Sequence, residues 1–497
     1  EIKREPARGF EDFEMDMNVS VVSSASFIGE SSLDKSGGPV KAGDVNGDGY
    51  DDFLIGAEGN DEGGEDSGQT YLILGKSSGW SMDLDLSKAD ASFIGEAAGD
   101  YSGFSVSGAG DVNGDGYDDI LIGAHVNDDG GYRAGQIYLV FGKASGWNMD
   151  MNLSQSDASF LGENSEDRTG WTAGAGDVNG DGYDDIIIGT GRNDEAAKNA
   201  GKIYLILGKS TGWSKDDSLF KADASFLGEN EWDEAGGVSG AGDVNGDGFD
   251  DILIGAGGNT EGGGPYTGQT YLILGKKTGW SKGVSLSKAD ASFLGENAHD
   301  FSGGTFSGAG DVNGDGYDDF LIGARYNGDG GFLSGKTYLI FGKSSGWSMD
   351  IDLSKSDASF IGEAAGDESG GKVSGAGDVN GDGMDDILIG AFHNNEGGSG
   401  AGQSYLVFGK SEGWSMDTNL STADASFIGE AGGDSLGSVS GAGDVNGDGY
   451  DDILIGAWAN DEGGSSSGQT YIILGIPEVS EPLEIYDISI TGELGED

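Results

Sequence analysis

A nine-residue acidic stretch recurs seven times along the chain at nearly constant spacing. The first copy, at residues 44–52, reads Asp-Val-Asn-Gly-Asp-Gly-Tyr-Asp-Asp, and later copies begin at Asp111, Asp177, Asp243, Asp311, Asp378 and Asp444. Successive copies start 66–68 residues apart, and each runs directly into an apolar segment such as 53–57. A fixed period of this length indicates a repeat architecture whose units share one continuous core.

Each repeat contains four β-type segments and no helix-length apolar pattern. In one repeat they fall at residues 91–96, 105–110, 120–124 and 136–142, each bounded by Gly, Asp or Ser. Four strands per unit and seven units match a β-propeller, which is built from four-stranded blades around a central axis. The sequence therefore predicts an all-β chain folded as a seven-bladed β-propeller of antiparallel blades.

The two ends of the repeat array are complementary. The seventh repeat stops at residues 471–475 without its last strand, and residues 15–30 supply a segment of the missing type. We therefore expect the N-terminal strand to join the C-terminal blade and close the ring, since closure removes exposed sheet edges. A linear solenoid is the alternative. The expected organisation is an N-terminal extension at 1–14, the propeller at 15–475 and an acidic C-terminal tail or linker at 476–497. That tail is alternatively a strand of a further domain or one donated to a neighbouring subunit.

The acidic stretch has the composition of a calcium-binding loop. Side-chain oxygens fall at positions 1, 3, 5 and 9, position 7 offers a backbone carbonyl, and two glycines allow sharp turns. An all-oxygen set suits Ca²⁺, whereas the absence of His and Cys argues against Zn²⁺. The start resembles an EF-hand loop, but position 12 is Ile55, which belongs to a strand rather than supplying the closing Glu.

We expect up to seven structural Ca²⁺ ions, one in each loop. The expected ligands are Asp44, Asn46, Asp48, Tyr50 and Asp52; Asp111, Asn113, Asp115, Tyr117 and Asp119; Asp177, Asn179, Asp181, Tyr183 and Asp185; Asp243, Asn245, Asp247, Phe249 and Asp251; Asp311, Asn313, Asp315, Tyr317 and Asp319; Asp378, Asn380, Asp382, Met384 and Asp386; and Asp444, Asn446, Asp448, Tyr450 and Asp452.

The order of these motifs resembles a known repeat. Phe-Ile-Gly-Glu, then Asp-x-Asn-x-Asp-Gly-x-Asp-Asp, then Ile-Leu-Ile-Gly-Ala is similar to the FG-GAP repeat of integrin α-subunit propellers and their bacterial and archaeal relatives, over about residues 15–475. The resemblance implies a seven-bladed propeller whose Ca²⁺ loops lie between the first two strands of each blade. Integrins bind metal in only some blades, and this chain lacks the other integrin domains, so a receptor role does not follow.

The formal charge of −62 restricts the partners. The seven loops hold 28 of the 88 acidic residues, so seven divalent ions would still leave −48. That charge argues against nucleic acid and against an anionic membrane surface. No apolar run is long enough to span a membrane.

The chain begins at Glu1, so we expect a processed product that is extracellular or displayed at the cell surface. Asn18, Asn152 and Asn419 head Asn-x-Ser sequons, which matter only in an exported protein.

The repeats differ from one another at two sets of loop positions. One set follows Ile-Gly-Ala, the other follows the Asp of the polar stretch after Gly-Glu, and strand alternation places both opposite the acidic loops. The candidate ligand-face residues are His125, Arg192, Arg325, Tyr326, Phe392, His393, Trp458, Tyr101, Arg168 and Phe301. We expect a protein or glycan ligand there, with neutral drift of surface loops as the alternative.

No catalytic constellation stands out. The three histidines do not recur with partners, and there is no cysteine, so we expect a protein that is not an enzyme. The function that the sequence favours is an extracellular calcium-stabilised propeller acting as a binding, adhesion or cell-surface structural module. One alternative is a self-assembling filament or surface-layer subunit that uses its terminal segments. Another is a propeller enzyme, a lyase or hydrolase, that acts on polysaccharide or lipid.

Overall fold

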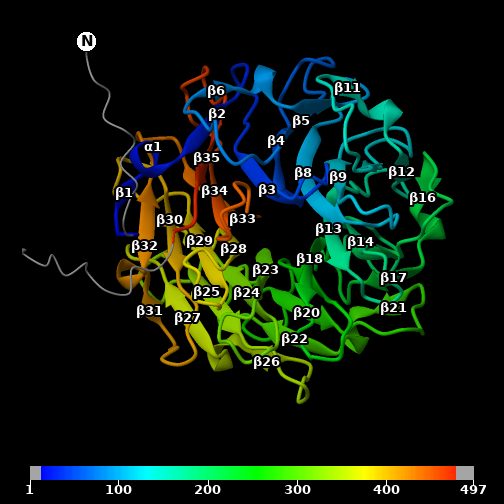
Figure 1. Cartoon of the computed structure of the whole chain (residues 1–497). Coiled ribbons are helices and arrows are strands. Elements are labelled where there is room, and N and C mark those ends of the chain that lie inside the picture. Colours follow the sequence, from blue (N-terminus) through cyan, green and yellow to red (C-terminus); the bar gives the residue numbers. More distant parts are fainter. Residues whose placement is uncertain (1–12, 477–497) are drawn as a thin grey trace, which may run out of the picture.

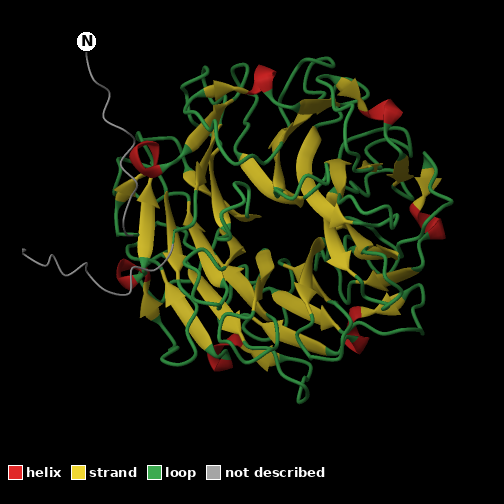
Figure 2. Cartoon of the chain, viewed as in Figure 1, coloured by secondary structure: helices red, strands yellow, loops and turns green. Residues whose placement is uncertain are grey.

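Seven similar sheets are arranged as blades in a closed ring (Figure 1). The computed structural model describes residues 13–476. Strands dominate the described part, and the few short helices lie at the outer rim (Figure 2). The prediction of an all-β, seven-bladed propeller is confirmed. None of the helices in residues 13–476 is long and apolar enough to cross a membrane.

Blade 1 shows the order of strands, from the axis outward. It contains β3 (Gly38–Gly43), β4 (Asp52–Ala57), β5 (Gln69–Ile73) and β7 (Ala91–Ile94), which pair antiparallel. A fifth strand, β11 (Met151–Asn152), pairs parallel to β7 on the outside. The sequence predicted the four antiparallel strands. The fifth was missed because two residues carry no periodic signal.

The other blades repeat this order, and their strands are given from innermost to outermost. Blade 2 contains β8 (Ser102–Gly110), β9 (Asp119–Ala124), β10 (Gln136–Val140), β12 (Ala158–Leu161) and β16 (Asp217–Ser218). Blade 3 contains β13 (Trp171–Gly176), β14 (Asp185–Thr190), β15 (Lys202–Ile206), β17 (Ala224–Leu227) and β21 (Val284–Ser285). Blade 4 contains β18 (Gly237–Gly242), β19 (Asp251–Ala256), β20 (Gln269–Ile273), β22 (Ala291–Leu294) and β26 (Ile351–Asp352).

The last three blades complete the ring. Blade 5 contains β23 (Thr305–Gly310), β24 (Asp319–Ala324), β25 (Lys336–Ile340), β27 (Ala358–Ile361) and β31 (Thr418–Asn419). Blade 6 contains β28 (Lys372–Gly377), β29 (Asp386–Ala391), β30 (Gln403–Val407), β32 (Ala425–Ile428) and β1 (Met17–Asn18). Blade 7 contains β33 (Leu436–Gly443), β34 (Asp452–Ala457), β35 (Gln469–Ile473), β2 (Ala25–Ile28) and β6 (Leu84–Asp85).

The N-terminal segment closes the ring, as the sequence predicted. Strand β2 pairs antiparallel with β35, with Phe27 opposite Thr470, and the two strands are neighbours in Figure 1. Strand β1 pairs parallel with β32 of blade 6, with Met17 opposite Phe427. The segment therefore enters two blades rather than one. The expected domain limits stay predictions because most of 1–14 and 476–497 lies outside the described residues.

A short helix follows each outermost strand. These helices are α1 (Val19–Val22), η1 (Leu86–Lys88), η2 (Leu153–Gln155), η3 (Leu219–Lys221), η4 (Leu286–Lys288), η5 (Leu353–Lys355) and η6 (Leu420–Thr422). Each begins after an Asn, Asp or Ser whose side chain accepts a backbone N–H two residues on. Asn18, Asn152 and Asn419 of the three sequons are among these caps, and their glycosylation stays a prediction.

The core lies between neighbouring blades. Leu54 and Leu72 of blade 1 pack with Ile120, Ile122 and Tyr138 of blade 2, and all five are fully buried. The second strand of each blade is apolar on both faces because both faces meet another sheet. Because the strands pack in this way around the whole ring, the polar groups considered below belong to the loops at the two ends of the blades.

Candidate functional site

The acidic loops join the first and second strands of every blade, as expected. In blade 1 the loop curls around the carboxylate of Asp44. Its Oδ1 accepts hydrogen bonds from the backbone N–H of Gly47 at 2.7 Å and Asp48 at 3.1 Å, and its Oδ2 accepts one from Gly49 at 2.9 Å. Gly47 and Gly49 have φ of 73° and 88°, a left-handed conformation that favours glycine.

Position 9 of each loop is a buried carboxylate. Asp52 is 0% exposed, and it accepts hydrogen bonds from the N–H of Val45 at 3.0 Å and of Gly75 at 2.7 Å. Burial, with the negative charges of Asp48 and Asp44, raises the pKa of Asp52 to about 8. In the other six loops the pKa of the equivalent carboxyl rises to about 7 or about 8 for the same main reason, burial. Such a carboxylate is costly unless a positive charge compensates it.

Position 3 lies beside position 9 in most loops. Asn113 Nδ2 is 3.2 Å from Asp119 Oδ2, and loops 3, 4, 5 and 7 have the same contact. Rotating the side-chain amide of Asn113 by half a turn would place its oxygen, instead of its nitrogen, on the side of Asp119. Position 5 is exposed in blade 1, at Asp48. Across residues 13–476, no three His, Cys, Asp or Glu side chains are already arranged to hold a metal ion. The donor types fit a hard cation, but ligation would require side-chain rotation, so the expected ligand set stays a proposal.

Position 8 links each loop to its neighbour, a role that sequence reasoning missed. Asp118 Oδ2 accepts a hydrogen bond from the N–H of Asp44 at 2.9 Å, while the Asp118 N–H donates to the Asp44 carbonyl at 3.3 Å. The same pair of bonds joins all seven loops, including Asp51 of blade 1 to Asp444 of blade 7. The sequence did carry a signal for this role. Position 8 is Asp in every copy, although the expected calcium ligands do not include it.

The side chain at position 7 packs on the preceding loop. A Cβ added to Gly47 would lie 2.6 Å from Tyr117 Cε1, so the tyrosine ring covers this glycine closely. Equivalent contacts join Gly114 to Tyr183 and Gly447 to Tyr50 across the closure. The seven loops therefore form one connected band on this face of the ring, which holds neighbouring blades together.

The variable residues lie on the opposite face and meet in pairs. The N–H of Val126 donates to the Asp100 carbonyl, so the loop after β9 contacts the polar stretch before β8. Tyr101 lies 5.9 Å from His125 between ring centroids, and Phe301 lies 5.7 Å from Tyr326. In each polar stretch the variable residue has a left-handed backbone, with φ of 52–56°. Glu368 and His393 form a third pair, in which His393 Nδ1 is 3.2 Å from Glu368 Oε1, and Trp458 is 42% exposed. Phe392 covers Gly371 and Gly437, so its ring packs into this face.

Arginine is confined to this face within the described part of the chain. All four arginines in residues 13–476 belong to its loops, at Arg133, Arg168, Arg192 and Arg325. Burial, followed by the charges of Arg168, Arg133 and Arg192, lowers the pKa of His125 to about 4. His125 is therefore neutral at physiological pH, and three guanidinium groups lie near it on an otherwise acidic protein.

Exposed aromatic side chains accompany the arginines. Phe104, near the start of β8, and five loop residues of this face, Tyr132, Trp232, Tyr266, Phe332 and Trp458, are 37–79% exposed. Sequence reasoning found only Trp458 of these six. Tyr132 and Phe332 occupy one variable position of the second polar loop and Tyr266 occupies the next, and this variation was the overlooked signal. A cavity of about 270 Å³ near Arg325 is lined by Trp171, Glu234, Phe301 and several glycines.

Comparisons with known proteins identify the repeat. The FG-GAP repeat matches at residues 40–73, 102–140, 169–206, 235–273, 303–338, 369–407 and 436–473, one match for each blade. Integrin alpha pat-2 of Caenorhabditis briggsae is 31% identical over 240 residues, which is 46% of this chain and 18% of the integrin. Integrin alpha-8 of Gallus gallus is 27% identical over 236 residues, 45% of this chain and 20% of that protein.

A similar match joins the chain to an enzyme. Phosphatidylinositol-glycan-specific phospholipase D of Bos taurus is 31% identical over 209 residues, 40% of this chain and 24% of that protein. The chain thus spans at most about a quarter of these relatives. On its seven matched repeats, one in each blade, the chain belongs to the FG-GAP repeat family.

Proposed function

We propose that the chain is an extracellular or surface-displayed binding module whose ring is held together by calcium and whose variable-loop face recognises a protein partner. One observation carries the binding role: the arginines and most exposed aromatic side chains of the described residues gather on a single face. Tyr, Trp and Arg are the residues that dominate the energetics of protein interfaces. The similarity to integrin alpha chains is in line with an adhesion role.

The calcium role rests on the loops. Each has a buried position-9 carboxylate near two further acids, with an amide at position 3, and all these donors are oxygens or can present one. A divalent ion would offset the charge that burial makes costly in all seven loops. Since the loops are linked to each other through position 8, an ion in each would stabilise the contacts between blades as well as the turn itself.

The preferred partner presents carboxylate groups. Arg168 and Arg192 stand beside the neutral His125 and can pair with carboxylates in a bidentate manner. Tyr132 and Phe104, 56% and 37% exposed, flank them and can add apolar contact area. An acidic glycan would present the same charge, and the experiment below separates the two.

The test compares two charge-reversal variants in a binding assay. The labelled chain is applied to a glycan array and to arrayed extracellular proteins in millimolar Ca²⁺. Arg168→Glu with Arg192→Glu should reduce protein binding at least tenfold. Lys215→Glu with Lys282→Glu, a matched charge change on the exposed outer rim, should leave it unchanged. Binding lost only in the rim variant would refute the proposed face, and signals on acidic glycans alone would overturn the protein partner.

We further propose that the chain is not itself an enzyme. His125, His299 and His393 stand in three different blades of the described ring. The phospholipase D of Bos taurus is matched over only 24% of its own length, so its activity is not transferred to this chain. Release of product from glycosylphosphatidylinositol-anchored substrate or from polysaccharide by the purified chain would contradict this. Sedimentation with and without residues 1–12 and 477–497 tests assembly through the termini.

A further inference from the structure

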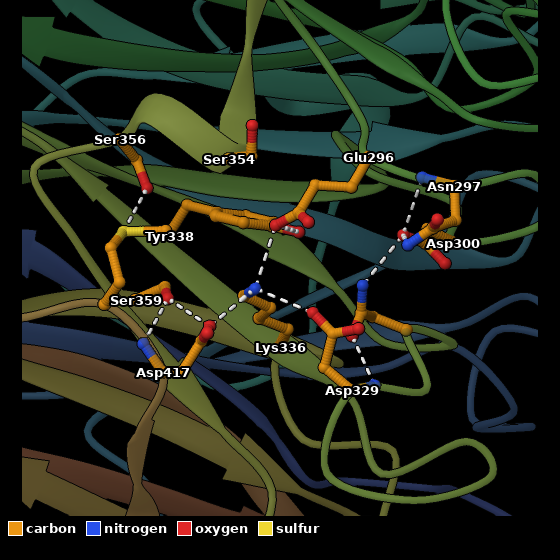
Figure 3. A network of polar contacts seen from close by, with 12 residues as sticks. Glu296, Asn297, Asp300, Asp329, Lys336, Tyr338, Ser354, Ser356, Ser359 and Asp417 are labelled. Atoms are coloured by element: carbon orange, nitrogen blue, oxygen red, sulfur yellow. Dashed lines mark hydrogen bonds and ion pairs between the residues drawn. The ribbon is translucent and has the colours of Figure 1, made fainter.

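Lys336, the first residue of β25, places its ammonium among three carboxylates (Figure 3). Its Nζ is 2.8 Å from Glu296 Oε1, from Asp329 Oδ2 and from Asp417 Oδ1, and the lysine side chain is 2% exposed. Glu296 follows β22 of blade 4, Asp329 lies in the loop before β25, and Asp417 precedes β31 of blade 5. One cation thus contacts three acids where two blades meet.

The corresponding position varies around the ring while the acids are mostly kept. Lys202 of blade 3 contacts Glu163 at 2.9 Å and Glu195 at 2.6 Å, and the third acid is replaced by Gly283. In the other five blades the lysine is replaced by Gln69, Gln136, Gln269, Gln403 and Gln469. The acids at the three corresponding positions are Glu30, Glu62 and Asp150; Glu96, Asp129 and Asp216; Glu229, Glu261 and Asp350; Glu363, Glu396 and Asp16; and Glu430, Glu462 and Asp83. These blades keep three carboxylates without the ammonium.

Blade 2 shows the consequence. Gln136 is 0% exposed, and its Nε2 donates to Asp216 Oδ1 at 3.2 Å, so the amide lies within the acidic group. Glu96, which follows β7 in blade 1, and Asp129, in the loop before β10, are the counterparts of Glu296 and Asp329. Gln136 Oε1 is buried and has no hydrogen-bond partner among the described residues.

The orientation of this amide oxygen is visible in blade 4. There the Tyr271 hydroxyl is 3.0 Å from Gln269 Oε1 and 3.0 Å from Glu229 Oε1, so the amide oxygen faces the tyrosine and the glutamate. In blades 1, 6 and 7, as in blade 2, the oxygens of Gln69, Gln403 and Gln469 are buried and lack a partner in the described structure. A buried acceptor without a donor is costly, and a bound cation would satisfy it.

We propose that blades 1, 2, 6 and 7 each bind one calcium ion in this acidic group, at the place that a lysine ammonium takes in blades 3 and 5. Three carboxylates and the glutamine carbonyl form an all-oxygen donor set, and the neighbouring tyrosine hydroxyl can complete it. The three ammonium contacts in blade 5 are 2.8 Å long. Ca²⁺–O distances are about 2.3–2.6 Å, and the acids of the described residues do not already stand in a metal-holding arrangement, so binding requires the acids of these four blades to move toward the ion. Blade 4 is left out because Tyr271 already satisfies its glutamine.

Crystals of the whole chain grown with Ca²⁺ and measured at long wavelength provide the direct test. Anomalous peaks are expected among Glu96, Asp129, Asp216 and Gln136, and at the equivalent groups of blades 1, 6 and 7, with none at Lys336 or Lys202. Density without an anomalous signal at these four groups would overturn the proposal. The acidic loops appear separately in the same map, so the failure of calcium in the loops is distinguishable from its failure here.

Two matched variants test the site in solution. Lys336→Gln recreates a glutamine beside three carboxylates, so it should bind one more Ca²⁺ per chain than the unaltered protein in equilibrium dialysis. In excess chelator, the melting temperature of this variant should be lower than that of the unaltered protein, and added Ca²⁺ should restore it. Lys202→Gln is the control, because Gly283 removes the third acid and no additional ion should bind. An equal gain in both variants, or no gain in Lys336→Gln, would refute the proposal.

Discussion

Phe27 is the residue through which ring closure can be measured. It belongs to β2, which the N-terminus adds to blade 7, and its side chain is 1% exposed. Its ring meets Phe53 at 5.6 Å between centroids, with a 71° angle between planes. Replacing a buried phenylalanine with alanine costs about 3–5 kcal/mol, because apolar contacts are lost and a cavity remains. We expect Phe27→Ala to lower the free energy of unfolding by that amount.

Phe293 provides a matched control inside one uninterrupted repeat. It is 2% exposed, pairs with a threonine as Phe27 does, and meets Phe320 at 5.3 Å and 72°. Both variants are followed by urea denaturation, using far-ultraviolet circular dichroism and tryptophan fluorescence. If β2 closes the ring as firmly as a covalently continuous strand, the two losses should agree within about 1 kcal/mol. A loss below about 1 kcal/mol for Phe27→Ala, beside a full loss for Phe293→Ala, would refute closure by this strand.

Three other perturbations test the remaining physical claims. Asp118→Ala removes the carboxylate that accepts a hydrogen bond from the Asp44 N–H of the neighbouring loop. The free energy of unfolding should therefore fall by about 1–3 kcal/mol in thermal or urea unfolding, and Asp118→Asn should recover part of the loss. An unchanged stability would show that this link between loops is not needed. Millimolar Ca²⁺ should raise the melting temperature relative to excess chelator, and Asp52→Asn should reduce that rise; equal melting temperatures in the two buffers would contradict a structural metal. Burial raises the pKa of Asp34 to about 6, above its usual value, so the folded state favours the protonated form. Its contribution is therefore fully present below about pH 4 and is lost as the pH rises through about 6. In chelator, Asp34→Asn should flatten that part of the stability profile, and an unaltered slope would exclude Asp34 as its source.

The local pattern was sufficient to predict the fold because each repeat carries its own signals. Ile120–Ile122 is apolar on both faces and Gly114 and Gly116 mark a tight loop, so strand, turn and strand follow from neighbouring residues. The complementary ends of the array then predicted closure. The strand β1 was not predicted, because Met17 and Asn18 pair with β32 only after the ring has formed.

The candidate sites were likewise predicted where their residues are consecutive in the sequence and missed where they come from separate loops. The acidic loops were found because their chemistry lies within nine consecutive residues. The cluster of Arg133, Arg168 and Arg192 was found only in part, since its members come from separate loops that the blades bring together. Phe104, at the edge of that cluster, gave no repeated signal at all. Residues that act across blades have no characteristic spacing that a single repeat could reveal.

The sequence by itself determined the number of blades, the strand order and the composition of each loop, because these depend on contacts within one period of 66–68 residues. Only the tertiary structure decided which groups meet between periods. Asp51 reaches the N–H of Asp444 across 393 residues of sequence, and Lys336 gathers acids from two blades. The reason is geometric: ring closure sets the distance between neighbouring blades, and hydrogen bonds and charge pairs at that boundary depend on this distance rather than on the local pattern.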